Sequence, residues 1–432
     1  MLLSGNHANT GNEWIVLSSL EMLLLLAGVV LGALLNHFIY ALAYFSPAIS
    51  PWQSRPEGLA KLPVAARVPM VGWLMRMPDR SVFGPYFWVR PLLIEILTPI
   101  LLVGLYRWVM SGTLMPIGVQ SLPPFIMGQF VCYAVLLCLM TVATFIDFDE
   151  QTIPDTITIP GTWIGVLGAT LVPGWLLTEA SRSGSPPFAT LATTLHANSP
   201  HAWPLEWGQV GWGWSIGMPL FIWCAWCCAL GNLRWITRRG IDKAFTYAVV
   251  GFFRSPNLGW IVSMMILGST LILMGYRWLP PERWQALLTS LLGVGLGGCL
   301  LWSFRIVASR VLQQEALGFG DVTLMSMVGA FLGWQVVWVA FFLAPLFGVA
   351  FVLVHMLVSR DAPIPFGPYL CAATAYLMLD WPRVWDVLSP VFPPVTSSLL
   401  LLVGLLVVLG ALLWVVHWLK LRMGLGAARI KT

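Results

Sequence analysis

Two aspartates stand where apolar stretches of the sequence meet polar residues. Asp321 ends the motif Gly318-Phe319-Gly320-Asp321 and precedes an apolar run, whereas Asp147 closes one. An ionisable group at the edge of an apolar run is expensive to bury, so each acid is a functional candidate. Two neighbouring carboxylates share a proton, so the charged one can activate a water and the protonated one can protonate a leaving amine. Such a pair would hydrolyse a peptide bond without a metal or a covalent intermediate.

Capping of a helix end is the alternative role for each acid. Asp321 stands at the head of its apolar run, where the helix dipole favours an acid, so it fits a capping role well. Asp147 stands at the C-terminal end of its run, where the dipole opposes a negative charge. Asp155 and Asp149 are its rivals as the catalytic acid; Asp155 follows Pro154 and is more simply a cap of the next helix.

Two glycines precede Asp321. Gly318 and Gly320 have no Cβ, so they would let a substrate backbone approach and would relieve constraints on φ and ψ just before the acid. We expect Gly318, Gly320 and Asp155 to support the catalytic pair. Asp149 and Glu150 form an acidic patch that would attract a basic peptide.

The composition predicts an all-α, polytopic membrane protein. The 432 residues have a mean hydropathy of +0.81 and are 9% charged, whereas soluble domains carry about 25% charged residues. A spanning helix needs about 20 apolar residues. We predict about eleven transmembrane helices, and the runs at 321–335 and 366–379 are short enough to be shielded half-spans. The predicted runs cover 22–45, 92–111, 125–147, 157–177, 210–231, 258–276, 286–304, 321–335, 336–357, 366–379 and 397–419.

The basic residues predict the orientation. With the N-terminus outside and alternating spans, the inside segments hold eighteen Lys and Arg residues and the outside segments five, a clear positive-inside bias. The C-terminus is then cytoplasmic, and Asp147 and Asp321 lie at the cytoplasmic face. The first run has no basic segment before it and is not expected to be a removable signal peptide.

The seven cysteines fall inside apolar runs, so we expect buried, unbridged side chains. His196 and His201 lie in a polar outside loop, 178–209, without an acidic or thiol partner nearby, so we expect surface residues and no metal site. No internal repeat and no nucleic-acid-binding motif is visible.

Seven segments, in order, make the chain similar to a known family. The chain resembles the type IV prepilin leader peptidases, membrane aspartic proteases of the GxGD class. The segments cover parts of 28–96, 130–160 and 312–372. They are Gly32–Tyr40, Val68–Leu74, Arg90 with Glu95, Ile146-Asp147 followed by Ile153–Asp155, Glu315–Asp321, Gly329–Gln335, and Ile364–Pro368.

The resemblance implies that Asp147 and Asp321 are the catalytic pair. It implies cleavage of a short basic leader from prepilin or pseudopilin substrates, at the cytoplasmic face of a bacterial inner membrane. Members of the family often also N-methylate the new terminus with S-adenosylmethionine, and this activity is associated with Asn36, Arg90 and Glu95 here. Proteolysis itself needs no cofactor.

The chain departs from the family pattern in several places. The cytoplasmic loop 46–91 has no cysteine, so we predict no zinc, and Thr323 stands where the family commonly has lysine. We expect one polytopic domain over 1–432, with a peptidase core at 125–380. Inserted spans at about 210–276 and a C-terminal span at 397–419 are additions to that core.

Two functions of other classes stay open. The same acids could serve a proton-coupled transporter, which would need polar residues along the spans, and this chain has few. A non-catalytic scaffold for pilus or secretion assembly is the other alternative, which the intact acids disfavour.

Overall fold

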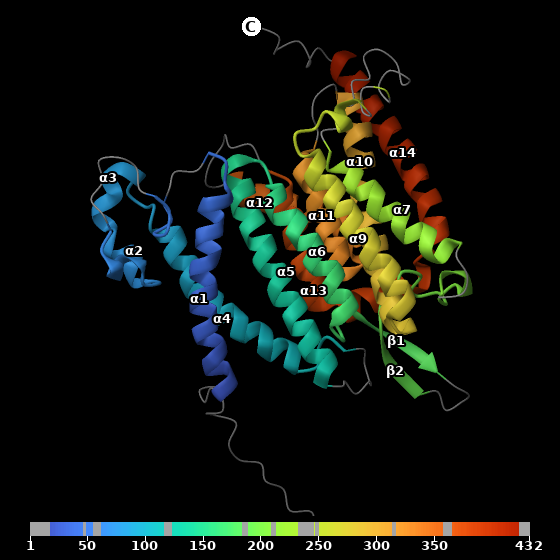
Figure 1. Ribbon diagram of the computed structural model, residues 1–432. Helices are drawn as coiled ribbons and strands as arrows, with labels where there is room; N and C mark the ends of the chain where they lie inside the picture. The colour runs from blue at the N-terminus through green and yellow to red at the C-terminus, as the bar shows by residue number, and fades with distance from the viewer. Residues whose placement is uncertain are drawn as a thin grey trace, which may run out of the picture. The chain divides into compact units, whose positions relative to one another are not determined.

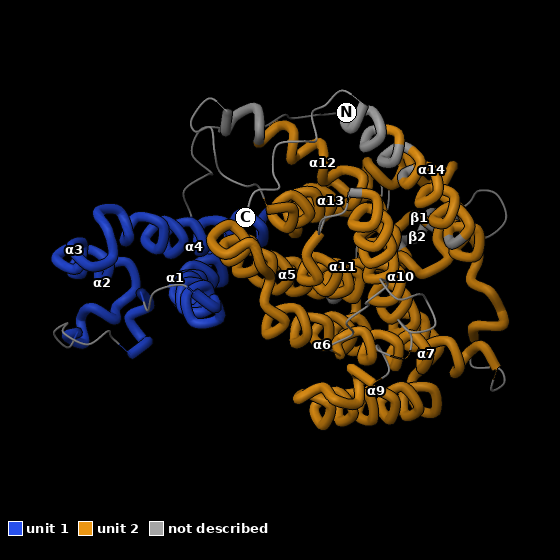
Figure 2. The backbone as a smooth tube through the Cα atoms, turned by 90° about the horizontal axis from the view of Figure 1, so that it is seen from above, with its two compact units in different colours: residues 1–108 blue, residues 109–432 orange. Residues whose placement is uncertain are grey.

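The structure is a computed structural model. It describes residues 18–45, 49–54, 62–115, 123–183, 189–208, 213–231, 246, 250–312, 317–356 and 365–422. The chain divides into two compact units, Met1–Trp108 and Val109–Thr432 (Figure 2). Half of the basic residues counted for the inside segments lie outside the described residues, as do Glu315 and Ile364. These basic residues are Arg55, Lys61, Arg234, Arg238, Arg239, Lys243, Arg360, Arg429 and Lys431.

Helices dominate, as the composition predicts, and the chain is an integral membrane protein. Each predicted apolar run coincides with a helix, but the count of eleven spans is not confirmed. Among the residues that the structure describes, six helices are long and apolar enough to cross a membrane, and a pair bent by 84° would make a seventh. Helices α7 and α11 have only 16 and 14 residues, and α6 has 17, fewer than the roughly 20 that a span needs.

Unit 1 contains two long helices and a short-helix segment between them. A capping box of Ser18 and Glu21 begins α1. Gly28 and Gly32 let α1 lie close to α4, since a Cβ on Gly28 would be 2.5 Å from the Cα of Pro99. The elements are α1 (Ser19–Leu42), η1 (Val64–Arg67), α2 (Val71–Met75), η2 (Met77–Asp79), α3 (Arg80–Phe83) and α4 (Val89–Met110).

Unit 2 is a helical bundle with a buried helix at its centre. Helix α11 is buried from Asp321 to Leu332 and lies among α6, α10 and α12 (Figure 1). It approaches α10 most closely at Gly329 and Gly293, where a Cβ on either residue would clash with the other backbone. The long helices are α5 (Pro123–Glu150), α6 (Asp155–Leu171), α7 (Trp214–Ala229), α9 (Leu258–Trp278), α10 (Pro281–Leu312), α11 (Phe319–Leu332), α12 (Trp334–Met356), α13 (Gly367–Leu388) and α14 (Val395–Arg422).

One hairpin interrupts the helices. Strands β1 (Thr178–Ser183) and β2 (Ala189–Thr194) pair antiparallel, and short 3-10 turns follow at η3 (Leu205–Trp207) and η5 (Ser389–Val391). The sequence reasoning did not anticipate this hairpin, which lies in the predicted outside loop.

The segment after the hairpin, residues 195–203, is a packed cap loop. Trp334 donates to the carbonyl of Ala197 at 2.6 Å, and Gln335 donates to the carbonyl of His196 at 2.7 Å. His196 is therefore half-buried, and the prediction of a surface residue is wrong for it but right for His201, which is exposed. The loop is ordered because its carbonyl groups accept hydrogen bonds from the start of α12.

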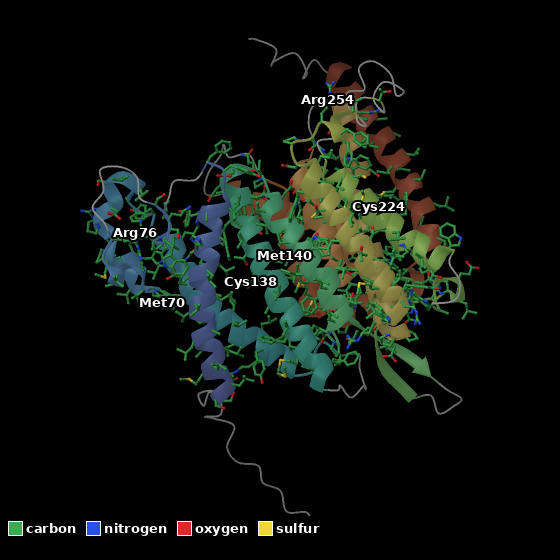
Figure 3. All side chains as sticks on the ribbon, viewed as in Figure 1. Met70, Arg76, Cys138, Met140, Cys224 and Arg254 are labelled. Carbon is green, nitrogen blue, oxygen red and sulfur yellow. The ribbon has the colours of Figure 1, made fainter. Side chains whose placement is uncertain are left out.

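All seven cysteines are free. Cys138 and Cys224 lie on separate helices, α5 and α7 (Figure 3). Cys132, Cys227 and Cys371 are buried as expected, whereas Cys299 is exposed. Cys299 lies on α10, which is long and apolar enough to cross a membrane.

Candidate functional site

Asp147 lies at the C-terminal end of α5. The amide of Gln151 donates to the carbonyl of Asp147 at 2.9 Å, and Gln151 has a φ of 55°, the left-handed conformation that ends many helices. The Asp147 side chain is 4% exposed, whereas its rival Asp149 is exposed. Burial therefore separates the two acids in favour of Asp147.

Asp321 lies in the first turn of α11, which Gly318 caps. Its carboxylate interacts with the backbone amide of Gly318, as an acid at the third helical position does in a capping box. Asp321 thus has the capping role expected for it, but this role uses only one of its two carboxylate oxygens. Oδ1 of Asp321 is buried and has no hydrogen-bond partner among the described residues.

The two free carboxylate oxygens converge on Gly367. A Cβ on Gly367 would be 2.5 Å from Oδ2 of Asp147 and 3.2 Å from Oδ1 of Asp321. Oδ2 of Asp147, like its counterpart, is buried without a partner in the part of the chain that the structure describes. Both distances are measured from the Cβ position of Gly367, so the structure brings the two predicted catalytic acids together.

The sequence reasoning included Gly367 only within the segment Ile364–Pro368 and did not single it out as a site residue. It is the first residue of α13, and its amide interacts with Asp147. Pro368 has no N–H, and the amides of Tyr369 and Leu370 bond to Phe366, which leaves the amide of Gly367 directed at the acid. The available signal was a Gly-Pro pair opening an apolar run, the pattern of a helix N-terminus that favours a nearby negative charge.

The two glycines before Asp321 act differently from the expectation. Gly318 has φ −68° and ψ 153°, an extended conformation open to any residue, so relief of φ and ψ constraints is wrong for this position. Gly320 permits close packing, since its Cβ would be 2.8 Å from the carbonyl oxygen of Ile153. It therefore fixes α11 against the turn between α5 and α6. Their approach to a substrate backbone stays a prediction.

Asp155 begins α6 and is exposed. Its carboxylate accepts from the hydroxyl of Thr323 at 3.5 Å, and the hydroxyl of Thr158 bonds to the same Thr323 oxygen at 3.0 Å. Asp155 thus lies where α6 meets α11, beside Thr323, which is one turn after Gly320. A supporting role for Asp155 stays a prediction.

Unit 1 brings together two of the three residues associated with methyl transfer. Glu95 is 2% exposed and accepts from Asn36 at 3.1 Å, from Trp73 at 2.8 Å and from the amide of Met70. Met70, which precedes α2, is labelled in Figure 3. Its φ of 61° is unfavourable for a residue with a side chain, and the hydrogen bond from its amide to Glu95 stabilises this conformation.

Arg90 lies nearby but separately. It donates to the hydroxyl of Tyr40 at 3.1 Å, one helical turn beyond Asn36, and its guanidinium is 5.3 Å from the Tyr40 ring centre. Oδ1 of Asn36 is buried and unpaired among the described residues. An unpaired buried acceptor is costly unless a ligand supplies the donor.

No group of three or more His, Cys, Asp or Glu residues that could hold a metal ion occurs in the described part of the chain.

A family model described as the type IV leader peptidase family matches residues 134–213 and 215–353, just over half of the chain. The chain belongs to this family. The matched residues include Asp147 and Asp321.

Curated relatives carry matching names. The chain is 30% identical over 161 residues to a prepilin leader peptidase/N-methyltransferase of Aeromonas salmonicida, covering 32% of this chain and 55% of that protein. It is 40% identical over 96 residues to one of Pseudomonas aeruginosa, covering 21% and 32%. It is 35% identical over 93 residues to the leader peptidase HopD of Escherichia coli, covering 21% and 57%. The chain thus spans about half the length of these curated relatives, or less. No solved structure matches the chain.

Proposed function

We propose that this chain is a membrane-embedded aspartic endopeptidase that removes the short basic leader of prepilin or pseudopilin proteins. The observation that carries the proposal is the convergence of two buried, unpaired carboxylate oxygens, from Asp147 and Asp321, beside Gly367. Membership of the leader peptidase family supports the class of substrate.

The reaction needs one charged and one protonated carboxylate. The charged one takes a proton from a water whose oxygen attacks the scissile carbonyl carbon, and the protonated one donates a hydrogen bond to the carbonyl oxygen. Collapse of the tetrahedral intermediate breaks the C–N bond, and a carboxyl proton passes to the leaving amine. The pair shares one proton, so its two ionisations belong to the pair and not to Asp147 or Asp321 alone.

Two helix N-termini lower the cost of the negative charge. Asp321 lies in the first turn of α11, and Asp147 meets the amide that begins α13. Partial positive charge at both helix ends stabilises a single anion shared by the two carboxylates. The bias of basic residues to one side supports a site at the cytoplasmic face, with the N-terminus outside and the C-terminus cytoplasmic.

The test is co-expression with a prepilin-like substrate, comparing wild type with Asp147→Asn, Asp321→Asn and Asp155→Asn. Asparagine keeps the shape of aspartate but cannot act as base or shared acid. We expect mature product to disappear in the first two variants and to persist with Asp155→Asn. Cleavage that survives both of the first two changes would remove the aspartic mechanism, and a wild type that cleaves no prepilin-like substrate would favour the transporter or scaffold alternatives.

A second activity is proposed for unit 1, the transfer of a methyl group from S-adenosylmethionine to the new N-terminus. The unpaired Oδ1 of Asn36 beside Glu95 favours it, because this oxygen is an acceptor for an N–H group of a bound ligand. The test is binding of S-adenosylmethionine to purified protein, together with mass spectrometry of the cleaved substrate. Asn36→Leu should weaken binding and abolish methylation while cleavage continues; binding equal to wild type would refute this role.

A further inference from the structure

One arginine of unit 2 contacts the turn that carries Asp321. Arg305 lies near the C-terminal end of α10 and is half-buried. Its Nε donates to the carbonyl oxygen of Leu317 at 2.9 Å, and its guanidinium lies 5.9 Å from the centre of the Phe319 ring. Leu317 and Phe319 stand on either side of Gly318, so a single side chain holds both ends of the α11 cap.

The guanidinium group also acts on the acid pair through charge. Arg305 attracts the Asp321 carboxylate, whereas Asp147 repels it. The thiol of Cys371 on α13 is the other titratable group with an electrostatic effect at this place. Arg305 is thus the cation that faces Asp321 among the described groups that act on it.

We infer that Arg305 is a positioning residue for the proposed peptidase reaction, which fixes the Leu317–Phe319 turn so that Asp321 meets Asp147 and supplies a positive charge to the carboxylate pair. The inference rests on the proposed function, and it assigns to α10 a part in the site that the two acids alone do not reveal.

The two roles of Arg305 can be separated because lysine and glutamine each keep one of them. Lysine keeps the charge but has no Nε–H in a planar fork to meet the Leu317 carbonyl. Glutamine keeps a donor group but loses the charge. Arg310 lies on the same helix and is exposed, so Arg310→Gln is a control that removes an equal charge from an exposed position of α10.

The experiment measures the pH dependence of substrate cleavage by the purified full chain, as wild type, Arg305→Lys, Arg305→Gln and Arg310→Gln. A nearby cation favours the ionised form of a carboxylate, so we expect Arg305→Gln to move both limbs of the pH profile upward by about half a pH unit or more. We expect Arg305→Lys to keep the profile but lose about tenfold in kcat through misplacement of Asp321. An Arg305→Gln profile and rate equal to those of Arg310→Gln would overturn the inference.

A second measurement works without catalysis. Hydrogen–deuterium exchange of the peptide spanning 317–323 should be faster in Arg305→Lys than in Arg310→Gln, because lysine releases the Leu317 carbonyl. Equal exchange in these two variants would refute the positioning role, whether or not the wild type cleaves the substrate. If the exchange rates differ as expected but the wild type does not cleave the substrate, the proposed function is refuted, whereas the contact between Arg305 and Leu317 is supported.

Discussion

Gly367→Ala is the sharpest test of the site because it adds one methyl group between the two acids. The new Cβ would lie 2.5 Å from Oδ2 of Asp147, 3.2 Å from Oδ1 of Asp321 and 2.9 Å from Cδ1 of Ile153. Carbon atoms in favourable contact are about 3.5–4.0 Å apart. The Asp147 oxygen must therefore retreat by roughly 1 Å or α13 must move, and a misplacement of that size costs about 100-fold in rate.

The cost in stability should be smaller than the cost in activity. Overpacking of a core by one methyl group typically costs about 1–3 kcal/mol, which an integral membrane protein can sustain. The matched control is Gly348→Ala on α12, whose Cβ would lie 3.5 Å from the ring of Tyr369, an ordinary contact beside the same helix.

The assay compares cleavage rates and thermal unfolding midpoints of wild type, Gly367→Ala and Gly348→Ala in the same detergent. We expect Gly348→Ala to match wild type in both and Gly367→Ala to lose about 100-fold in kcat/KM while it still unfolds cooperatively. A Gly367→Ala enzyme within a few fold of wild type would refute the convergence of the two acids on this glycine.

Three further outcomes follow from contacts elsewhere. Glu95→Gln should lower the free energy of unfolding by about 1–3 kcal/mol, because one acceptor oxygen replaces two that serve three donors, whereas Glu282→Gln at an exposed position should have no effect in the same thermal scan. Burial lowers the pKa of His196 to about 4, so on acidification the imidazole is protonated in the unfolded chain before it is protonated in the folded one. Stability should therefore fall as the pH drops from about 6.5 towards 4, and His196→Gln should remove that part of the pH dependence of the unfolding midpoint. Gly320→Ala should cost more activity than Gly318→Ala, because its Cβ would be 2.8 Å from a backbone oxygen whereas the other would meet a carboxylate at 3.4 Å; equal losses would contradict the close-packing argument.

The sequence predicted the helices well and the spans less well. Apolar runs located each of the long helices, because lipid or a protein core demands apolar side chains, but periodicity does not say which of the two covers a helix. The short helices α2 and α3 were not predicted. Helix α11 shows the difficulty, since it is as apolar as a span yet has 14 residues and no exposed face from Val322 to Leu332. The hairpin was missed because its strands, Thr178–Ser183 and Ala189–Thr194, are short and polar and carry little alternation.

The sequence also identified both acids, by their position at the ends of apolar runs. It could not identify Gly367 as their meeting point, because that depends on three helices whose order in space no linear pattern contains. It assigned the wrong reason to Gly318, whose backbone angles are ordinary. The sequence alone does not distinguish a glycine that close packing requires from one that an unusual φ requires. The three hydrogen bonds to the Glu95 carboxylate were likewise not predicted, because their donors, Asn36, Met70 and Trp73, are far from Glu95 in the sequence.

The cap loop, 195–203, follows the β1–β2 hairpin and has a part in the architecture of the site. Helix α11 carries Asp321 at its first turn and ends at Gly333, where a φ of 88° turns the chain into α12. The next two residues, Trp334 and Gln335, hold the carbonyls of the cap loop. The two ends of α11 set its position along its own axis, and so they set the place of the carboxylate in its first turn. Arg305 contacts the turn at the first end and the cap loop holds the second, which explains why a loop on the far side from the acids is so fully hydrogen-bonded.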